Sequence, residues 1–244
     1  MNYKDIFEQR GGMYHQAMMS YPNARQLEFE VPLSICQPKA NDVLVDLPSG
    51  GGYISNYIDP KVKLVCLESS LQFTSFCQKK NLQVSLYENN QLPLVDSEAD
   101  VLISIAGLHH IENKIPLFKE MRRILKPAGR LCIADVQHGS QMALFLDDIV
   151  DRYSDTGHCG IYLFDQTKEE LSNAGFSDIK QKLLTYHWKF SSMQSMVVYF
   201  KLLFGLTKAT NDEVLKGIKQ YLTVHSTQQI VKVEWQLLSF SVTS

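Results

Sequence analysis

The stretch that decides the fold is Asp42-Val43-Leu44-Val45-Asp46-Leu47-Pro48-Ser49-Gly50-Gly51-Gly52. Its first half is a short apolar run that ends near an acidic residue, and its second half is a glycine-rich loop. A short apolar run bounded by turn residues is typical of a buried strand. Consecutive glycines let the backbone pass close to a ligand, because no Cβ stands in the way. The stretch therefore predicts a strand whose carboxyl end carries a binding loop.

Four further apolar runs follow, separated by segments long enough to be helices: Val62 to Leu67, Leu82 to Leu86, Ala99 to Ile105, and Leu131 to Ala134. Short apolar strands that alternate with helices indicate βαβ units and a parallel sheet covered on both faces. In such a sheet the ligand lies at the carboxyl ends of the strands. We therefore look for the functional residues just after each run.

The two ends of the chain differ from this pattern. Residues 3–19 and 24–37 read as two helices, whereas 176–190 and 230–242 read as strands. The two late strands are separated by helical patterns near 191–204 and 212–222, so they can lie antiparallel. We expect an α/β fold with a Rossmann-like, seven-stranded, mostly parallel sheet, an antiparallel C-terminal strand and a small helical cap.

The acidic residues at the strand ends are suited to a nucleoside. Glu68 ends the second predicted strand, and its carboxylate can accept hydrogen bonds from both hydroxyls of a ribose. Glu88 and Asn89 follow the third strand, where they can accept an exocyclic amino group such as that of adenine. The helix expected after the glycine loop would offer free N–H groups to a carboxylate.

Five ordered motifs make the chain resemble the class I S-adenosylmethionine-dependent methyltransferases, in the group with the methyltransferase type 11 pattern. The motifs are Asp46–Gly52, Leu67-Glu68, Glu88–Leu94, Ala106-Gly107-Leu108-His109-His110-Ile111 and Arg123–Leu131. They span about residues 40–136 and are specific for fold and cofactor, but they say little about the substrate. The resemblance divides a single domain of residues 1–244 into N-terminal helices (1–40), a cofactor-binding core (41–136) and a C-terminal half (137–244) with its cap at about 191–228.

By this resemblance the cofactor is S-adenosyl-L-methionine. Gly50 and Gly52 should lie against its methionyl part, Glu68 should bind the ribose, and Glu88 with the Asn89 backbone should bind adenine. Ala106 should line the methyl-donor side. The full set of expected cofactor-binding residues is Tyr14, Asp46, Pro48, Gly50, Gly52, Glu68, Ser69, Glu88, Asn89 and Ala106.

Pro48 departs from the family pattern, which has a glycine at this position. Proline restricts φ and removes an N–H, so the departure bears on cofactor affinity. It keeps open a non-catalytic or non-methylating relative that binds the cofactor and acts as a partner subunit. A second alternative is a NAD-dependent oxidoreductase, but the dinucleotide fingerprint needs a third glycine where this chain has Ser55.

Sulfonium methyl transfer is an in-line displacement that depends mainly on aligning the acceptor. His109, His110 and His138 follow strands 4 and 5 and are the candidate general bases. Apolar side chains of the cap, between Met193 and Phe204, either line a site for a rather apolar small-molecule acceptor or pack on the sheet. The sequence does not choose the acceptor atom or the oligomeric state.

Composition excludes several other functions. The formal net charge is −2, so a nucleic-acid partner is not expected. The five cysteines form no CxxC pair and predict neither a metal site nor a disulfide framework, which suggests a reducing, cytoplasmic location. The N-terminus starts no apolar signal, and the most apolar stretch, Met196 to Leu206, is too short for a membrane span.

Overall fold

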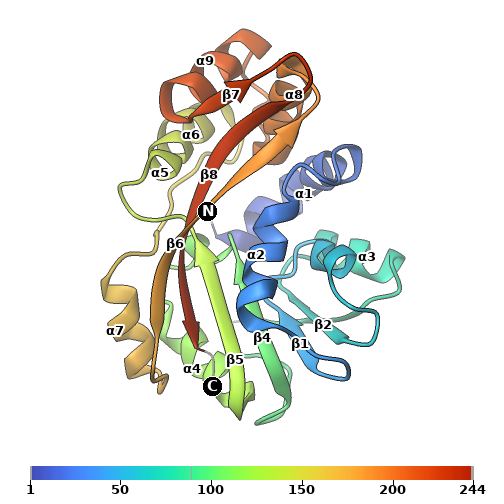
Figure 1. Ribbon diagram of the computed structural model, residues 1–244, viewed down its shortest axis with the longest axis vertical. Coiled ribbons are helices and arrows are strands. Elements are labelled where there is room, and N and C mark those ends of the chain that lie inside the picture. Colours follow the sequence, from blue (N-terminus) through green and yellow to red (C-terminus); the bar gives the residue numbers. More distant parts are fainter. Residues whose placement is uncertain (1, 89, 243–244) are drawn as a thin grey trace.

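A twisted mixed sheet runs through the computed structural model, which describes residues 2–88 and 90–242 (Figure 1). The strand order is β3-β2-β1-β4-β5-β8-β6, and β7 pairs with β8. Strands β1 to β5 are parallel to one another, and β8 lies antiparallel between β5 and β6. The bounds are β1 Val43–Asp46, β2 Lys63–Glu68, β3 Gln83–Leu86, β4 Ala99–Ile105, β5 Leu125–Asp135, β6 Lys180–Phe190, β7 Val224–Ser226 and β8 Val231–Val242.

The predicted fold class is confirmed, with one correction to the strand count. The described residues form eight strands instead of seven, because the chain turns at Thr227 and pairs β7 with β8. Three residues are too few to show an alternating pattern, so the sequence analysis missed β7. Strand β5 also begins earlier than predicted, at Leu125. Between Leu125 and Arg130 its pairing with β4 shifts register, and this part of the strand includes polar residues.

The helices lie on both faces of the sheet and over one end of it (Figure 1). The α-helices are α1 Tyr3–Ser20, α2 Gln26–Cys36, α3 Leu71–Lys79, α4 Ile115–Ile124, α5 Gln141–Phe145, α6 Asp151–Tyr153, α7 Gln166–Asn173, α8 Met193–Phe204 and α9 Asn211–Tyr221. The shorter turns are η1 Tyr53–Tyr57, η2 Leu108–His110 and the π-helical η3 Leu146–Val150. No helix of the described residues is long and apolar enough to span a membrane.

The cap forms because both of its helices are well delimited, with α8 strongly apolar and α9 apolar on one face. Ser192 and Thr210 each make a capping box that satisfies N-terminal N–H groups of α8 and α9. Gly205 adopts a φ of 65° and ends α8 in a left-handed conformation. The apolar face of α8 then packs on β6 and β8, where the rings of Trp188 and Trp235 stack 4.2 Å apart. Most of the cap's apolar residues are therefore core residues.

Candidate functional site

The glycine loop after β1 turns sharply beneath β4. The Leu47–Pro48 peptide bond is cis, and Ser49 donates its N–H to the carbonyl of Leu67. The Pro48 ring packs against Gly107, where an added Cβ would lie 2.3 Å from the proline Cγ. Proline is thus accommodated because the residue that faces it has no side chain. Gly50 has a φ of +54°, a conformation that a larger residue adopts only with strain.

The prediction of a helix that offers free N–H groups directly after this loop is wrong. Residues Tyr53–Tyr57 form one short 3₁₀ turn, and the Tyr53 ring folds back over Gly51. The N–H of Gly50 does not point into an open anion site but donates to Glu68 at 2.7 Å. A five-residue turn supplies few aligned N–H groups, so any carboxylate bound here depends on other donors.

Glu68, next to the glycine loop, is a carboxylate that accepts several hydrogen bonds from the protein itself. It has no exposed surface and accepts hydrogen bonds from the backbone of Gly50, Ser69 and Ser70 at 2.7–2.9 Å. The hydroxyl of Tyr3 donates the fourth bond, at 3.1 Å. Burial raises the pKa of Glu68 to about 8, although each of these donors lowers it. Tyr3 therefore occupies an oxygen that a ribose hydroxyl would need.

Aromatic side chains of α1 fill the space above the strand ends. Phe7 packs on Phe73 of α3 with ring centroids 4.9 Å apart, and Tyr14 contacts both rings. The helix begins at Tyr3, and the side chain of Asn2 caps its first turn. The first turns of α1 therefore lie where the sequence predicts the cofactor.

Three cavities surround this part of α1. One of about 380 Å³ lies outside it, and two of about 40 and 50 Å³ lie beneath it. Tyr3 separates the 380 Å³ cavity from the 40 Å³ cavity, and Phe7 separates the 40 Å³ cavity from the 50 Å³ cavity. Cavities that hold a drug-sized ligand usually measure about 300–1,000 Å³, so the inner two are too small without movement of α1.

The predicted cofactor residues distribute over these cavities as follows. Ser69 and Glu88 line the largest, which we call the outer cavity; Tyr14, Asp46, Pro48, Gly50 and Ala106 line the 40 Å³ inner groove. Gly52 lies deeper, where an added Cβ would be 2.4 Å from Leu82, so its role is in packing. Asn89 lies outside the described residues. Glu88 is exposed and forms an ion pair with Lys4 of α1 at 2.9 Å.

The 50 Å³ cavity, which we call the histidine cavity, has an apolar wall and a polar wall. Its apolar wall includes Trp188, Trp235, Leu203 and Phe204 from the cap side. Two residues of α8 thus reach the cavity, while its other buried residues pack in the core; that the cap lines a site for an acceptor stays a prediction. His109, His110 and His158 line the opposite wall.

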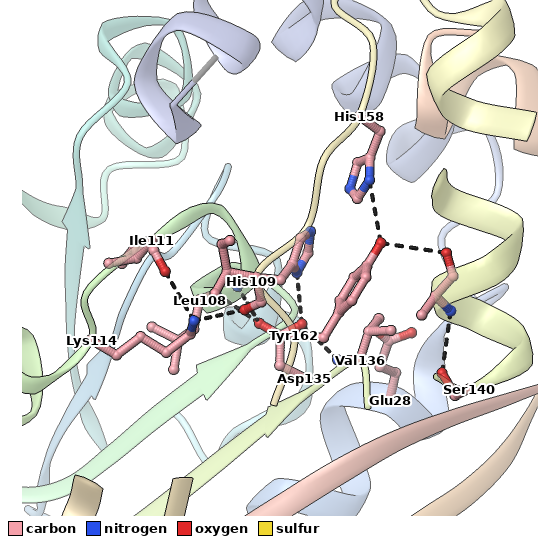
Figure 2. A network of polar contacts seen from close by, with 12 residues as sticks. Glu28, Leu108, His109, Ile111, Lys114, Asp135, Val136, Ser140, His158 and Tyr162 are labelled. Atoms are coloured by element: carbon pink, nitrogen blue, oxygen red, sulfur yellow. Dashed lines mark hydrogen bonds and ion pairs between the residues drawn. The ribbon is translucent and has the colours of Figure 1, made fainter. Parts of the chain in front are cut away.

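His109 is held by a buried carboxylate at the end of β5. Its Nδ1 donates to Asp135 at 2.7 Å, and Asp135 also accepts from the backbone N–H groups of Leu108 and His109. Burial raises the pKa of Asp135, but His109 and the backbone donors outweigh it and hold that pKa below its usual value. The Nε2 of His109 is thereby left on the side of His158 (Figure 2).

His158 comes from an irregular segment after α6. Its Nδ1 lies 3.2 Å from Asp147, and the hydroxyl of Tyr162 donates to the same carboxylate at 2.5 Å. Figure 2 shows the same Nδ1 facing the Tyr162 hydroxyl, at 3.4 Å. Its Nε2 is buried and has no hydrogen-bond partner within residues 2–88 and 90–242. Burial lowers the pKa of both His110 and His158, so their imidazoles are neutral near pH 7. His138 is exposed and does not line the histidine cavity.

Two arginines of this region escaped sequence analysis. Arg25 forms a buried bidentate pair with Glu28 at 2.5 and 2.9 Å, and the Trp188 indole donates to the same carboxylate at 2.7 Å. Arg10 is buried and donates to the carbonyl of Phe204, but its Nε has no partner. Arg10 lies on α1 and Arg25 is the N-cap residue of α2, both outside the recognisable motifs, so only three-dimensional packing reveals them. Asp135 carried a detectable signal, since it ends a predicted strand.

Comparisons with known proteins agree with this geometry. Residues 45–133 match the family described as "Methyltransferase domain". Over its whole length the chain superimposes on a S-adenosylmethionine-dependent methyltransferase from Thermotoga maritima, with a TM-score of 0.66, 16% identity, and coverage of 99% of this chain and 100% of that one. Residues 45–133 thus match a methyltransferase domain, and the whole chain has the fold of the methyltransferase on which it superimposes.

The curated relatives match only part of this chain. A malonyl-[acyl-carrier protein] O-methyltransferase from Marinomonas is 26% identical, over 57% of this chain and 55% of that protein. A thiol S-methyltransferase from Rattus norvegicus is also 26% identical, over 58% and 63%. The chain thus spans little more than half the length of these relatives, and the two act on different acceptors by name.

Proposed function

We propose that this protein binds S-adenosyl-L-methionine and transfers its methyl group to a small, rather apolar molecule. The observation that carries the proposal is Glu68, a buried carboxylate at the end of β2 that faces the glycine loop at 2.7 Å. Its position suits a ribose diol, because a carboxylate can accept from both hydroxyls at once. The family of residues 45–133 supports the same assignment.

The remaining cofactor contacts follow from the lining of the cavities. In this proposal Ser69 and Glu88 contact the adenosine part in the outer cavity, together with the backbone at Asn89. Asp46, Pro48 and Gly50 contact the methionyl part in the inner groove. Tyr14 and Ala106 line both the groove and the histidine cavity, so they border the point where the methyl group passes.

Cofactor binding then requires the first turns of α1 to move. Tyr3 must leave Glu68, and Phe7 must leave the space between the inner groove and the histidine cavity. The lost contacts include the Tyr3–Glu68 hydrogen bond, the Lys4–Glu88 ion pair and several ring contacts, which the cofactor would replace with its own. The same movement would join the two small cavities into a site large enough for cofactor and acceptor.

When bound, the sulfonium of the cofactor supplies an activated methyl group. The acceptor's lone pair would displace S-adenosylhomocysteine from this methyl group, so that one bond to carbon forms as the carbon–sulfur bond breaks. The chain's task is to align the acceptor, and alignment can lower the barrier by about 7–11 kcal/mol in favourable cases. The indole rings and Leu203 would hold an apolar body, and His109 and His110 would face its reacting atom. His138, exposed outside this cavity, would act only if the loop after β5 moved.

Calorimetric titration with S-adenosylhomocysteine tests the proposal, with NAD as a negative control. We expect micromolar binding, roughly −8 kcal/mol. At pH 9, above the pKa of about 8 that burial gives Glu68, Glu68→Ala should weaken it by about 1.5–3 kcal/mol, the range for hydrogen bonds to a charged group. Glu169→Ala, an exposed change on α7, is the matched control and should leave affinity unchanged. An unaltered affinity in Glu68→Ala would remove the ribose assignment.

The second candidate is a non-methylating relative that acts as a partner subunit. The covered groove favours it, because Tyr3 already bonds to Glu68 and α1 fills the cofactor space. This candidate predicts no binding of S-adenosylhomocysteine, or tight binding without release of the product from S-adenosyl-L-methionine in a cell extract.

A further inference from the structure

Three imidazoles converge at one side of the histidine cavity. His109 and His110 lie in the turn η2 after β4, and His158 lies about fifty residues later in the irregular segment after α6. One ring nitrogen from each lies within 4.8 Å of the others. The rings of His109 and His110 are 4.1 Å apart, and each lies 5.5–5.6 Å from His158. The sequence did not predict this cluster, because its third member is remote.

Two of the three rings are oriented by carboxylates on their far side. Asp135 accepts from Nδ1 of His109, and Asp147 accepts from Nδ1 of His158. Each ring is thereby held as the tautomer whose Nε2 carries a lone pair. The Nε2 of His158 is buried and has no partner among the described residues. Carboxylate, imidazole and metal in a row is the arrangement in which proteins orient metal-binding histidines.

We propose that His109, His110 and His158 bind a divalent transition-metal ion, with zinc as the preferred ion. Neutral imidazole nitrogens are ligands for this class of metal, and three of them with an open fourth position are typical of catalytic rather than structural zinc sites. Zn–N bonds of about 2.0–2.1 Å imply nitrogens roughly 3.3 Å apart, so the rings must draw together on binding. His158 can supply this movement because it lies outside regular secondary structure.

The segment that carries His158 is nevertheless anchored. The backbone N–H of His158 donates to Asp151 at 2.8 Å, and Ile161 donates to the carbonyl of His109 at 2.8 Å. The second of these bonds ties the segment directly to the turn that carries the other two histidines. Movement of the ring therefore needs side-chain rotation and small backbone shifts, not unfolding of the segment.

The surrounding charges permit a cation. The Arg10 guanidinium lines the same cavity and opposes a second positive charge. Asp135 and Asp147 lie directly behind two of the proposed ligands and offset it. The fourth coordination position would face the cavity wall formed by Leu203 and Trp235, where the acceptor is proposed to lie. That last role rests on the proposed function, whereas metal binding itself does not.

The test is titration of chelator-treated protein with Zn²⁺ and Co²⁺, without any cofactor. We expect one equivalent to bind, and the Co²⁺ complex should show the visible absorption of a tetrahedral or five-coordinate ion. Asp147→Asn should weaken binding by about 10–100-fold, the usual effect of losing an outer carboxylate. His158→Ala should weaken it by more than that, since it removes a ligand.

The control uses the other candidate group, His187, His225 and Glu234 on strands β6 to β8. His225 is exposed, and His225→Ala should leave the affinity unchanged. Thermal unfolding checks that each variant is folded, and X-ray absorption of the wild-type complex counts histidine ligands without any substitution. The proposal is overturned if no equivalent of metal binds, or if His225→Ala abolishes binding and His158→Ala does not. Because cofactor is absent, failure here leaves the S-adenosylhomocysteine titration to judge the proposed function separately.

Discussion

The inner groove and the histidine cavity both border Ala106, yet they differ in how their polar groups are satisfied. Beside the groove, Glu68 is fully buried, lines none of the three cavities and accepts four hydrogen bonds from the chain itself. In the histidine cavity, the Nε2 of His158 and the Nε of Arg10 are buried without partners. Buried polar groups are normally paired, so unpaired ones mark a place for a ligand. The groove is thus closed by its own helix, whereas the histidine cavity still has bonds to offer.

The difference arises from where α1 lies. Tyr3 and Phe7 descend from its first turns onto the end of β2 and onto α3, and they supply the groove with both a donor and an apolar filling. Further along the helix, Arg10 and Tyr14 instead face the cavity and the Arg25–Glu28 pair. One helix therefore closes one site and lines the other, so movement of α1 would affect both.

The largest expected effect concerns the wall that the two sites share. Arg25 lines both of them, and Arg25→Met would leave Glu28 buried without its counter-ion. We expect unfolding in urea to show a loss of about 3–5 kcal/mol, the usual effect of breaking a buried pair from one side. The double variant Arg25→Met/Glu28→Gln should recover part of the loss. A loss below 1 kcal/mol in the single variant would show that the wall is not rigid.

The next prediction concerns pH. Burial raises the pKa of Glu68 to about 8, so the folded state holds a proton that the unfolded chain, with a pKa near 4.5, releases earlier. Stability from this group is complete below pH 4.5 and declines as the pH rises toward 8. At about 1.36 kcal/mol for each pH unit between the two values, the decline amounts to a few kcal/mol.

The comparison that isolates this effect is wild type against Glu68→Gln, with urea unfolding measured from pH 5 to pH 8. Glu68→Gln keeps a similar shape but does not titrate, so its stability should fall less as the pH rises. Parallel pH profiles for the two proteins would mean that Glu68 is ionised in the folded state throughout.

The smallest expected effect tests the closure of the groove. Tyr3→Phe removes the hydroxyl that bonds to Glu68 but keeps the ring that packs on Phe7. We expect S-adenosylhomocysteine to bind more tightly by about 0.5–1.5 kcal/mol, the net value of one hydrogen bond that no longer competes. Weaker binding in Tyr3→Phe would mean that the hydroxyl helps to hold the ligand instead.

Most of the sheet could be predicted because each strand is a short apolar run of its own. β1 and the glycine loop are adjacent in sequence, so their role follows from local pattern alone. The short turn at Tyr53 was mispredicted, because a ring that folds back over Gly51 depends on packing and not on periodicity. β7 was missed for a related reason, since its pairing with β8 is what makes it a strand.

The sequence by itself determined the order of the motifs along the parallel strands, the position of Glu68 and the match of residues 45–133 to a methyltransferase domain, because these depend on residues close together in the chain. Only the tertiary structure decided that α1 covers the groove and that His158 joins His109 and His110. Those contacts link residues 65 and 48–49 positions apart, as in the bond from Tyr3 to Glu68. Contacts over such separations depend on how helices and loops pack on the sheet, and no local pattern encodes that packing.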